Sequence, residues 1–383
     1  MSEVDKPQEI RFTTSSRQPD QVRADLQTWL TGRLGAAAAP VITGLTTPER
    51  NGLSSETVLF DAEWTESGVR AEHRLVARLA PPGDSFPVFP SYDLTGQFET
   101  MRLVGELSSV PVPGVLWNEP DPAALGTPFF VMRRVDGQVP PDLMPYTFGD
   151  SWLMAGDTEQ RRRASDSTVR ALAGLHRIAD PRSVFAFLDR GDRSASPLRR
   201  HVDANRAWLT WIERDGPAPL LDRCFDWLDE HWPAEEPPTV VTWGDARIGN
   251  IIYAGFQPAA LLDWEMAGLG PGEVDLAWLI FLHRFFDDLA LELGLEGMPD
   301  FLGRSDVEQI YARETGHVPR DMDWYLVYAA ARHGIALTRV SQRAVHFGEA
   351  EPPADPDAPV LHRATLEAMM AGTYWPALAP DRK

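Results

Sequence analysis

Lysine is nearly absent from this chain of 383 residues: only Lys6 and Lys383 carry an ammonium side chain. Every other positive charge is an arginine or a histidine, so a phosphate site of the kind that normally uses lysine needs a substitute here. The chain has a single cysteine, Cys224. One cysteine excludes an intramolecular disulfide and is typical of a reducing compartment, so we expect a cytoplasmic protein.

Long apolar runs are also missing. The most apolar stretches, such as residues 276–282, are far shorter than the roughly 20 residues that cross a bilayer as a helix. Residues 1–20 are polar and charged, so we expect no signal peptide. The composition therefore predicts no membrane partner.

Acidic residues outnumber basic ones by 56 to 36, which gives a formal net charge of −20. Such a charge argues against nucleic acid or an anionic membrane as the main partner and favours a cationic one. Hydrophobic residues make up 43% and charged residues 24%, as in ordinary globular proteins. The length is enough for two domains with a substantial core.

Four residues whose side chains carry potential oxygen ligands occur between residues 245 and 265, and their spacing matches a known catalytic loop. Asn250 follows Asp245 by five residues, which is the D-x-x-x-x-N spacing of kinase-like catalytic loops. Asp263 lies 13 residues after Asn250, enough for one β-hairpin, and Glu265 lies two further on. The spacing predicts Asp245 as the group that orients and deprotonates a hydroxyl. Asn250 and Asp263, with Glu265, are the predicted Mg²⁺ ligands.

Each of these residues alone is equally typical of a turn or a strand end, and only their combination points to chemistry. Arg247, inside the same loop, is predicted to offset negative charge on the transferred group. The apolar stretches at residues 251–253 and 259–262 predict the two strands of the hairpin.

The segment resembles the aminoglycoside phosphotransferase and choline kinase-like family. That family's pattern is H-G-D-x-x-x-x-N, a hydrophobic strand ending in Asp, and then G-x-x-x-x-D-L-A. The matching segments here are 243–250, 262–265 and 270–277. The form Asp263-Trp264-Glu265 is similar to a branch that includes kinase-like domains linked to acyl-CoA dehydrogenases and actinobacterial proteins of unassigned substrate. The resemblance covers roughly residues 40 to 340.

The chain departs from the pattern at Trp243, where the family has His. We interpret Trp243 as a structural replacement, since its indole N–H can still donate; the other interpretation is an inactive enzyme. The resemblance implies that Asp275 is a buried acid holding the backbone amides of the catalytic loop. It also places His176 at a recurring Leu-His position, which we interpret as a core histidine braced by backbone groups.

The resemblance implies an α+β, bilobal protein kinase-like fold with a small, mostly antiparallel β lobe and a larger α-helical lobe. Residues 1–135 are expected to form an N-terminal helix and the nucleotide-binding lobe. Residues 136–383 are expected to hold the catalytic loop, the metal site and the acceptor pocket. Periodicity and turn signals predict a lid-like helix at 19–34 and strands at 41–45, 56–64, 74–79 and 128–135. The same signals predict helices at 94–107, 157–178, 197–214, 219–231 and 361–370. Several more helices are expected between residues 275 and 345.

The expected ATP site collects residues from three segments. Gly52, Ser54 and Ser55 are predicted to form a loop that covers the phosphates. Arg78 is predicted to substitute for the kinase lysine, with Glu99 rather than Glu106 as its acidic partner. Met132, Arg133 and Val135 are predicted to lie around the adenine. Arginine suits phosphate oxygens through its forked geometry. An ordinary hairpin turn and a surface arginine are the alternatives for the first two segments.

We therefore predict an ATP- and Mg²⁺-dependent phosphotransferase, monomer or homodimer, that acts on a hydroxyl of a small molecule. Antibiotic, acyl-CoA-linked and aminoalcohol acceptors all remain open. The acidic run Asp287, Asp288, Glu292 and Glu296 either meets ammonium groups of the acceptor or is a solvated helix face. A catalytically silent nucleotide-binding protein is the alternative function, and a metal-dependent phosphate hydrolase is the third.

Overall fold

The computed structural model describes residues 17–47, 55–81, 86–141, 145–148 and 151–378. Contacts within the chain divide it into two compact units. One comprises Met1–Leu94, Leu116–Arg134 and Ala336–Asp355, and the other Thr95–Val115, Val135–Ile335 and Pro356–Lys383. The first is rich in strands and the second in helices, so the α+β class is confirmed.

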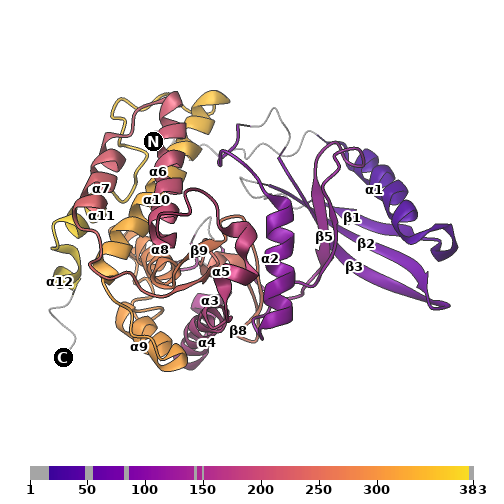
Figure 1. The fold of residues 1–383 in the computed structure, drawn as a ribbon, viewed down its shortest axis with the longest axis horizontal. Coiled ribbons are helices and arrows are strands. Elements are labelled where there is room, and N and C mark those ends of the chain that lie inside the picture. Colours follow the sequence, from indigo (N-terminus) through magenta and orange to yellow (C-terminus); the bar gives the residue numbers. More distant parts are fainter. Residues whose placement is uncertain (1–16, 48–54, 82–85, 142–144, 149–150, 379–383) are drawn as a thin grey trace, which may run out of the picture. The chain divides into compact units, whose positions relative to one another are not determined.

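A five-stranded sheet forms the first unit (Figure 1). Its strands are β1 (Val41–Thr46), β2 (Glu56–Glu66), β3 (Val69–Leu79), β4 (Val115–Glu119) and β5 (Phe129–Arg133), in the order β1-β2-β3-β5-β4. The pairs β1–β2, β2–β3 and β3–β5 are antiparallel. Two details differ from expectation: β3 begins five residues earlier than its predicted start at Arg74, and β4 was not predicted.

Helix α1 (Pro19–Leu34) covers this sheet (Figure 1). Its predicted stripe, Val22, Leu26 and Leu30, is buried in one core with alternate residues of β2, such as Val58 and Phe60. The periodicity predicted the helix correctly, but a lid-like role was wrong, because its apolar face is part of the core of the unit. Burying such a face is what stabilises a short helix.

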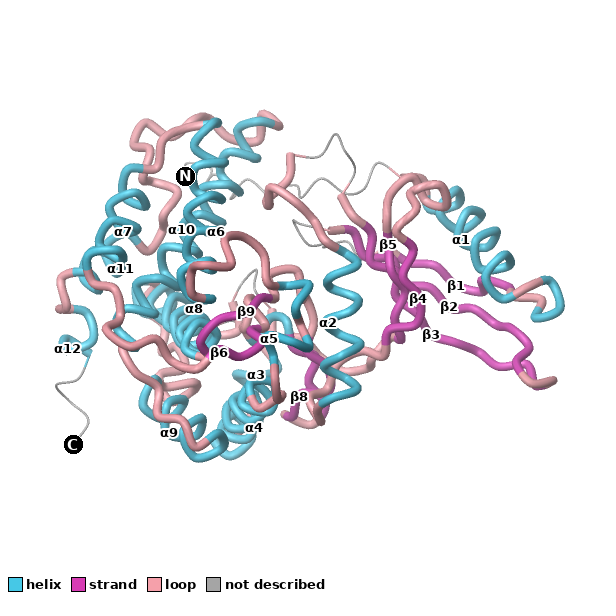
Figure 2. The backbone as a smooth tube through the Cα atoms, viewed as in Figure 1, coloured by secondary structure: helices cyan, strands magenta, loops and turns pink. Residues whose placement is uncertain are grey.

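The second unit is built from helices around two small strand pairs (Figure 2). The helices are α2 (Leu94–Leu107), α3 (Trp152–Ala155), α4 (Thr158–His176), α5 (Pro181–Val184), α6 (Pro197–Ile212), α7 (Pro219–Glu230), α8 (Glu273–Glu292), α9 (Arg304–Thr315), α10 (Met322–His346), α11 (Arg363–Met370) and α12 (Tyr374–Leu378). Helix α2 begins at the unit boundary, and the end of α10 belongs to the first unit. β6 (Thr239–Thr242) pairs with β9 (Gly268–Pro271), and β7 (Ile251–Ala254) pairs with β8 (Gln257–Leu261), both antiparallel.

Local signals account for most of the predicted helix boundaries. Asp157 caps α4 through a capping box with Gln160, in which each side chain bonds the other residue's backbone N–H. Proline in the first turn starts α6 and α7. None of the helices in the described part of the chain has the length and apolar character needed to cross a membrane.

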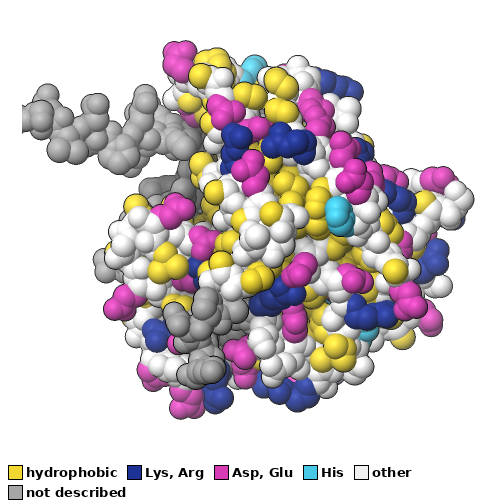
Figure 3. Space-filling view, turned by 90° about the vertical axis from the view of Figure 1, so that its left-hand side faces the viewer, with side chains coloured by type: hydrophobic (Ala, Val, Ile, Leu, Met, Phe, Trp, Pro, Cys, Tyr) yellow, Lys and Arg dark blue, Asp and Glu magenta, His cyan; other side chains and the backbone are white. Residues whose placement is uncertain are grey.

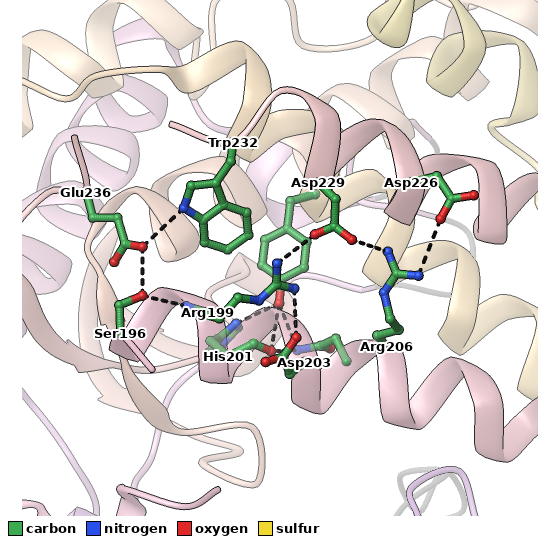
Figure 4. A network of polar contacts seen from close by, with 11 residues as sticks. Ser196, Arg199, His201, Asp203, Arg206, Asp226, Asp229, Trp232 and Glu236 are labelled. Atoms are coloured by element: carbon green, nitrogen blue, oxygen red, sulfur yellow. Dashed lines mark hydrogen bonds and ion pairs between the residues drawn. The ribbon is translucent and has the colours of Figure 1, made fainter. Parts of the chain in front are cut away.

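Charged side chains of both signs are interleaved on the face drawn in Figure 3. An ion-pair network ties α6 to α7 at the surface (Figure 4). Arg199 and Arg206 of α6 both contact Asp229 of α7, at 2.6 and 2.7 Å, and the Arg199 guanidinium stacks over the ring of Trp232. These contacts fix α6, whose inner face carries His201.

Candidate active site

The catalytic loop begins with a turn that only glycine accommodates. Gly244 has φ +88°, and a Cβ built there would lie 1.9 Å from the carbonyl oxygen of Met266. An L-residue would therefore be strained and would also collide with backbone. Because the loop follows β6 and Met266 precedes β9, the pairing of these strands holds the turn in place. Asp245 follows directly.

Asp275 anchors this turn from helix α8. Its side chain is fully buried and accepts hydrogen bonds from the backbone N–H of Trp243 at 2.6 Å and of Gly244 at 2.8 Å. Its Oδ2 also lies 3.0 Å from Nε2 of His176. The predicted role of Asp275, holding the loop's amides, is confirmed.

Trp243 and His176, both near the loop, hold the fold together through hydrogen bonds. Trp243 is buried, and its indole Nε1 donates to the carbonyl of Leu262 at 2.8 Å, which confirms that it still donates a hydrogen bond. His176 is a core histidine as predicted, but side chains brace it rather than backbone. Its Nδ1 lies 2.9 Å from the hydroxyl of Tyr311, and its Nε2 contacts Asp275.

Three donors hold the carboxylate of Asp245. Nε1 of Trp278 donates to Oδ1 at 2.7 Å. Nδ2 of Asn250 donates to Oδ2 at 2.6 Å, and Nε of Arg247 lies 3.1 Å from the same oxygen. The structure thus brings together three of the residues that the motif predicted, and Arg247 pairs with the acid of its own loop.

The β7–β8 hairpin brings the backbone of the candidate metal ligands Asn250 and Asp263 close together. Ile251 pairs with Leu261, and the N–H of Leu262 donates to the carbonyl of Asn250 at 2.8 Å, so Asn250 stands beside the strand end that carries Asp263. Asp263 itself has φ +58°, a left-handed conformation that Asp tolerates better than most residues. The hairpin explains how residues 13 apart become neighbours.

These oxygens fit Mg²⁺. Since Nδ2 of Asn250 donates to Asp245, the amide keeps its oxygen as the remaining polar atom. Asp263 directly follows Leu262, whose N–H donates to the backbone carbonyl of Asn250. Hard cations prefer such oxygen donors and keep several waters. Within the described residues, His, Cys, Asp and Glu form no group of three that could hold a metal, so an ion here would complete its shell with the amide, phosphate oxygens and water. Glu265, two residues beyond Asp263, stays a predicted ligand.

Residues predicted for the nucleotide are only partly described. Gly52 and Ser54 lie outside the described residues. Ser55 is buried just before β2, and its Oγ has no hydrogen-bond partner within the part of the chain that the structure covers. Met132 and Arg133 end β5, and Val135 follows it. Their contacts with a nucleotide stay predictions.

Arg78 lies on β3, as predicted, opposite Thr57 of β2, to whose Oγ1 its Nη1 donates at 3.0 Å. Both acids considered as its partner lie on α2 and bind Arg102. Glu99 and Glu106 are each 2.8 Å from that guanidinium. The pairing of Arg78 with Glu99 stays a prediction.

Two of the four acids in the predicted run, Asp287 and Asp288, are bound by other groups of the fold, whereas Glu292 and Glu296 are exposed. Asp287 is buried and accepts from the N–H of Met298 at 2.6 Å and from Arg284 at 2.9 Å. Asp288 accepts from Arg284 and from the hydroxyl of Tyr374. The interpretation as a solvated helix face was therefore wrong for these two residues, because the chain folds back over them.

Sequence reasoning missed Trp278, Tyr311 and Arg332. Trp278 had a usable signal: it stands three residues after Asp275, and residues three apart lie on the same side of a helix. Tyr311 and Arg332 gave no such signal, since tertiary packing brings Tyr311 of α9 to His176 and Arg332 of α10 to the loop. Arg332 donates from Nη2 to the carbonyl of Gly244 at 3.0 Å.

A small hollow of about 210 Å³, including space open to solvent, lies beside Arg247 and Gly249. His283 lines it. Its Nε2 lies 3.1 Å from the carbonyl of Met298, which can only accept, so Nε2 carries the proton. Its Nδ1 therefore accepts from the hydroxyl of Tyr146 at 3.0 Å. Burial lowers the pKa of His283 to about 3, so the ring is neutral in the folded protein.

This histidine should make the fold sensitive to acid. As the pH falls below 6.5, the ordinary pKa, the unfolded chain takes up a proton that folded His283 refuses until about pH 3. Stability is thus lost on acidification, by up to about 1.4 kcal/mol per pH unit from this residue. We expect the urea midpoint of His283→Gln to fall less than that of the wild type between pH 7 and 5. Identical pH dependence of the two proteins would contradict this assignment.

Comparisons with known proteins agree with this geometry. The model of the phosphotransferase enzyme family, APH, matches residues 50–299. The probable acyl-CoA dehydrogenase IBR3 of Arabidopsis thaliana is 28% identical over 249 residues, which are 60% of this chain and 29% of that protein. Acyl-CoA dehydrogenase family member 10 of Mus musculus is 24% identical over 289 residues, 72% of this chain and 25% of the relative. The chain thus spans between a quarter and a third of the length of these relatives.

Solved structures share the fold. A protein of Ralstonia eutropha JMP134, provisionally assigned as an aminoglycoside phosphotransferase, superposes with a TM-score of 0.62 at 18% identity, over 92% of this chain and 98% of that one. A macrolide 2'-phosphotransferase type I gives 0.55 at 17% identity, over 92% and 98%. Aminoglycoside phosphotransferase APH(4)-Ia, in complex with ADP and hygromycin B, gives 0.53 at 13%, over 91% and 98%. The kinase-like fold is therefore confirmed.

Proposed function

This chain belongs to the phosphotransferase enzyme family, and we propose that it transfers the γ-phosphoryl group of ATP, with Mg²⁺, to a hydroxyl of a small molecule. Its family membership already makes it a phosphotransferase of the kinase type acting on hydroxyl groups. The observation that carries this proposal is the carboxylate of Asp245, held by Trp278, Asn250 and Arg247 one hairpin away from the oxygen donors of Asn250 and Asp263. Nucleotide complexes of proteins with this fold are consistent with it.

Asp245 would act on the acceptor. Its carboxylate orients the hydroxyl and takes its proton as the new O–P bond forms, while the bond from the γ-phosphorus to the bridging oxygen breaks and ADP leaves with the electron pair. Phosphoryl transfer depends mainly on positioning and on neutralising charge, so fixing this carboxylate matters. Asn250 and Asp263, with Glu265, would hold Mg²⁺, which neutralises phosphate charge when bound.

The remaining nucleotide roles follow from the residues already placed. Arg78 would pair with the α- and β-phosphates, backed by Glu99, and the loop of Gly52, Ser54 and Ser55 would cover the triphosphate. Met132, Arg133 and Val135 would adjoin the adenine. Arg247 would face charge on the transferred group when the acceptor displaces its contact with Asp245.

Two of the four acids considered for the acceptor are engaged within the fold, whereas Glu292 and Glu296 are exposed and stay candidates. Because Asp287 and Asp288 are bound by Arg284 and by groups of their own fold, they do not support recognition of ammonium groups. An antibiotic acceptor, as in the names of the structural neighbours, stays possible through other groups. An acyl-CoA-linked hydroxyl, in line with the named relatives, and an aminoalcohol are the other acceptors to test.

The test is a panel of acceptors with Mg²⁺ and ATP: an aminoglycoside, a macrolide, choline and a hydroxyacyl-CoA. We expect one class of acceptor to be phosphorylated, with one phosphorylated molecule formed for each ADP. EDTA should abolish the reaction. Nucleotide binding without ADP formation from any acceptor or from water would favour the silent nucleotide-binding alternative. Phosphate release that no acceptor accelerates would favour a hydrolase.

A further inference from the structure

Arg332 is a buried cation whose position the phosphotransferase motif does not explain. Its side chain is 1% exposed on α10. Nη2 donates to the carbonyl of Gly244, whereas Nε and Nη1 have no hydrogen-bond partner among the residues described. Burying a charge without a carboxylate partner is costly. A packing role alone would be served better by an apolar side chain.

Arg332 forms no direct ion pair among the described residues; aromatic rings contact it, and the charges of Asp275 and Asp245 act on it from further away. The guanidinium carbon lies 4.5 Å from the ring centroid of Trp278 and 5.6 Å from that of Tyr328. A cation over an aromatic face is attracted by the ring's negative charge density, more so when water is excluded. Arg332 is therefore bound between one ring of α8 and one of its own helix.

Trp278 connects this stack to the catalytic carboxylate. Its indole Nε1 donates to Oδ1 of Asp245 at 2.7 Å, while its ring contacts Arg332. Arg332 in turn holds the carbonyl of Gly244, the residue just before Asp245. The same guanidinium thus restrains Asp245 twice, through its backbone and through the indole that binds its side chain.

The far side of the stack is anchored as well. The hydroxyl of Tyr328 lies 2.7 Å from Nδ1 of His201 and 2.9 Å from Nδ2 of Asn205, both on α6. α6 is in turn fixed to α7 by the ion pairs of Figure 4. A fixed outer end is what a positioning stack needs, since an arginine between two loose rings would restrain nothing.

We propose that Trp278 and Arg332 are positioning residues for the phosphotransfer reaction: together they hold the carboxylate of Asp245 in the orientation that receives the acceptor's proton. This inference rests on the function proposed above. It assigns roles to two residues, 33 and 87 positions beyond Asp245, that lie outside the catalytic motif. Displacing a reacting group by about 1 Å can cost on the order of 100-fold in rate.

The first experiment measures the slow hydrolysis of Mg·ATP, with water as acceptor. Trp278→Phe keeps an aromatic ring for Arg332 but removes the indole donor, and Arg332→Met keeps much of the side-chain length. We expect each to lower kcat by about 10- to 100-fold with an unchanged KM for ATP. Both residues act through Asp245, so their effects should not add. The kcat of the double variant should therefore lie within about twofold of the kcat of the slower single variant.

Matched controls separate this role from general damage. Trp29→Phe removes an indole donor in the other unit, which bonds Oε2 of Glu119 at 2.9 Å, and Arg200→Met removes another buried arginine, which pairs with Asp189. Both should keep kcat close to the wild-type value. Control variants as slow as the positioning variants, or positioning variants as fast as the wild type, would overturn the proposal.

A second measurement does not depend on turnover. In protein labelled with ¹⁵N-tryptophan, the indole signal of Trp278 is the one, out of 13, that disappears in Trp278→Phe. We expect Asp245→Asn and Arg332→Met to shift this signal more than the other twelve. No shift in either variant would refute the hydrogen-bonded stack. A clear shift together with full hydrolysis by Asp245→Asn would leave the stack in place and reject the proposed function instead.

Discussion

Replacing Asp245 with asparagine is expected to lower the rate of phosphoryl transfer by about 10²- to 10⁴-fold, the usual contribution of a positioned acid or base. Asparagine has nearly the same size, and its Oδ1 can still accept from Trp278, so the loop should keep its shape. What it loses is the ability to take the acceptor's proton, together with the Oδ2 acceptor that Asn250 and Arg247 bind. The measurement is the initial rate of ADP formation with the best acceptor, together with the affinity for Mg·ATP.

A matched control is Asp166→Asn on α4, whose partly exposed carboxylate pairs with Arg170 at 3.5 Å. That variant should keep both rate and affinity. Asp245→Asn should keep the affinity within a few-fold while losing the rate. Transfer at full speed by Asp245→Asn would end the assignment of Asp245 as the base.

The parts of this site that the sequence predicted are those set by short-range geometry. Asn250 and Asp263 are joined by a single hairpin, so their spacing alone predicted that their backbone segments would lie side by side. Asp275 could be assigned because the family pattern includes it and because a buried acid at a helix start stabilises nearby amides. Helix boundaries followed equally local signals, such as the capping residue Asp157.

The parts that could not be predicted depend on long-range packing. β4 has five half-buried residues and no alternation, so nothing in its sequence distinguishes it from a loop. The acidic run looked like a solvated helix face because its spacing is helical. Of its four residues Asp287 is buried, where the turn at Gly297, with φ +65°, brings the N–H of Met298 onto its carboxylate. Arg332 reaches Gly244 of the loop across 88 residues, and no periodicity encodes that contact.

Asp275→Ala is expected to produce the largest loss of stability in this site, about 3–5 kcal/mol in the free energy of unfolding. The carboxylate is fully buried and serves the backbone N–H groups of Trp243 and Gly244 and the ring of His176. Its removal leaves two buried amides without an acceptor, each costing about 1–3 kcal/mol, and a cavity besides. Thermal unfolding should show a Tm lower by on the order of 10 °C.

Asp323→Ala is the comparison for this variant, since its carboxylate is exposed and pairs with Arg304 at the surface. It should cost less than about 1 kcal/mol. If Asp275→Ala cost no more than that, the amides would have found other acceptors, and Asp275 would not be the anchor of the loop. The two central acids thus have opposite expected signatures. Asp245→Asn loses rate while the fold stays intact, whereas Asp275→Ala loses stability first, and its rate falls because the turn at Gly244 no longer presents Asp245.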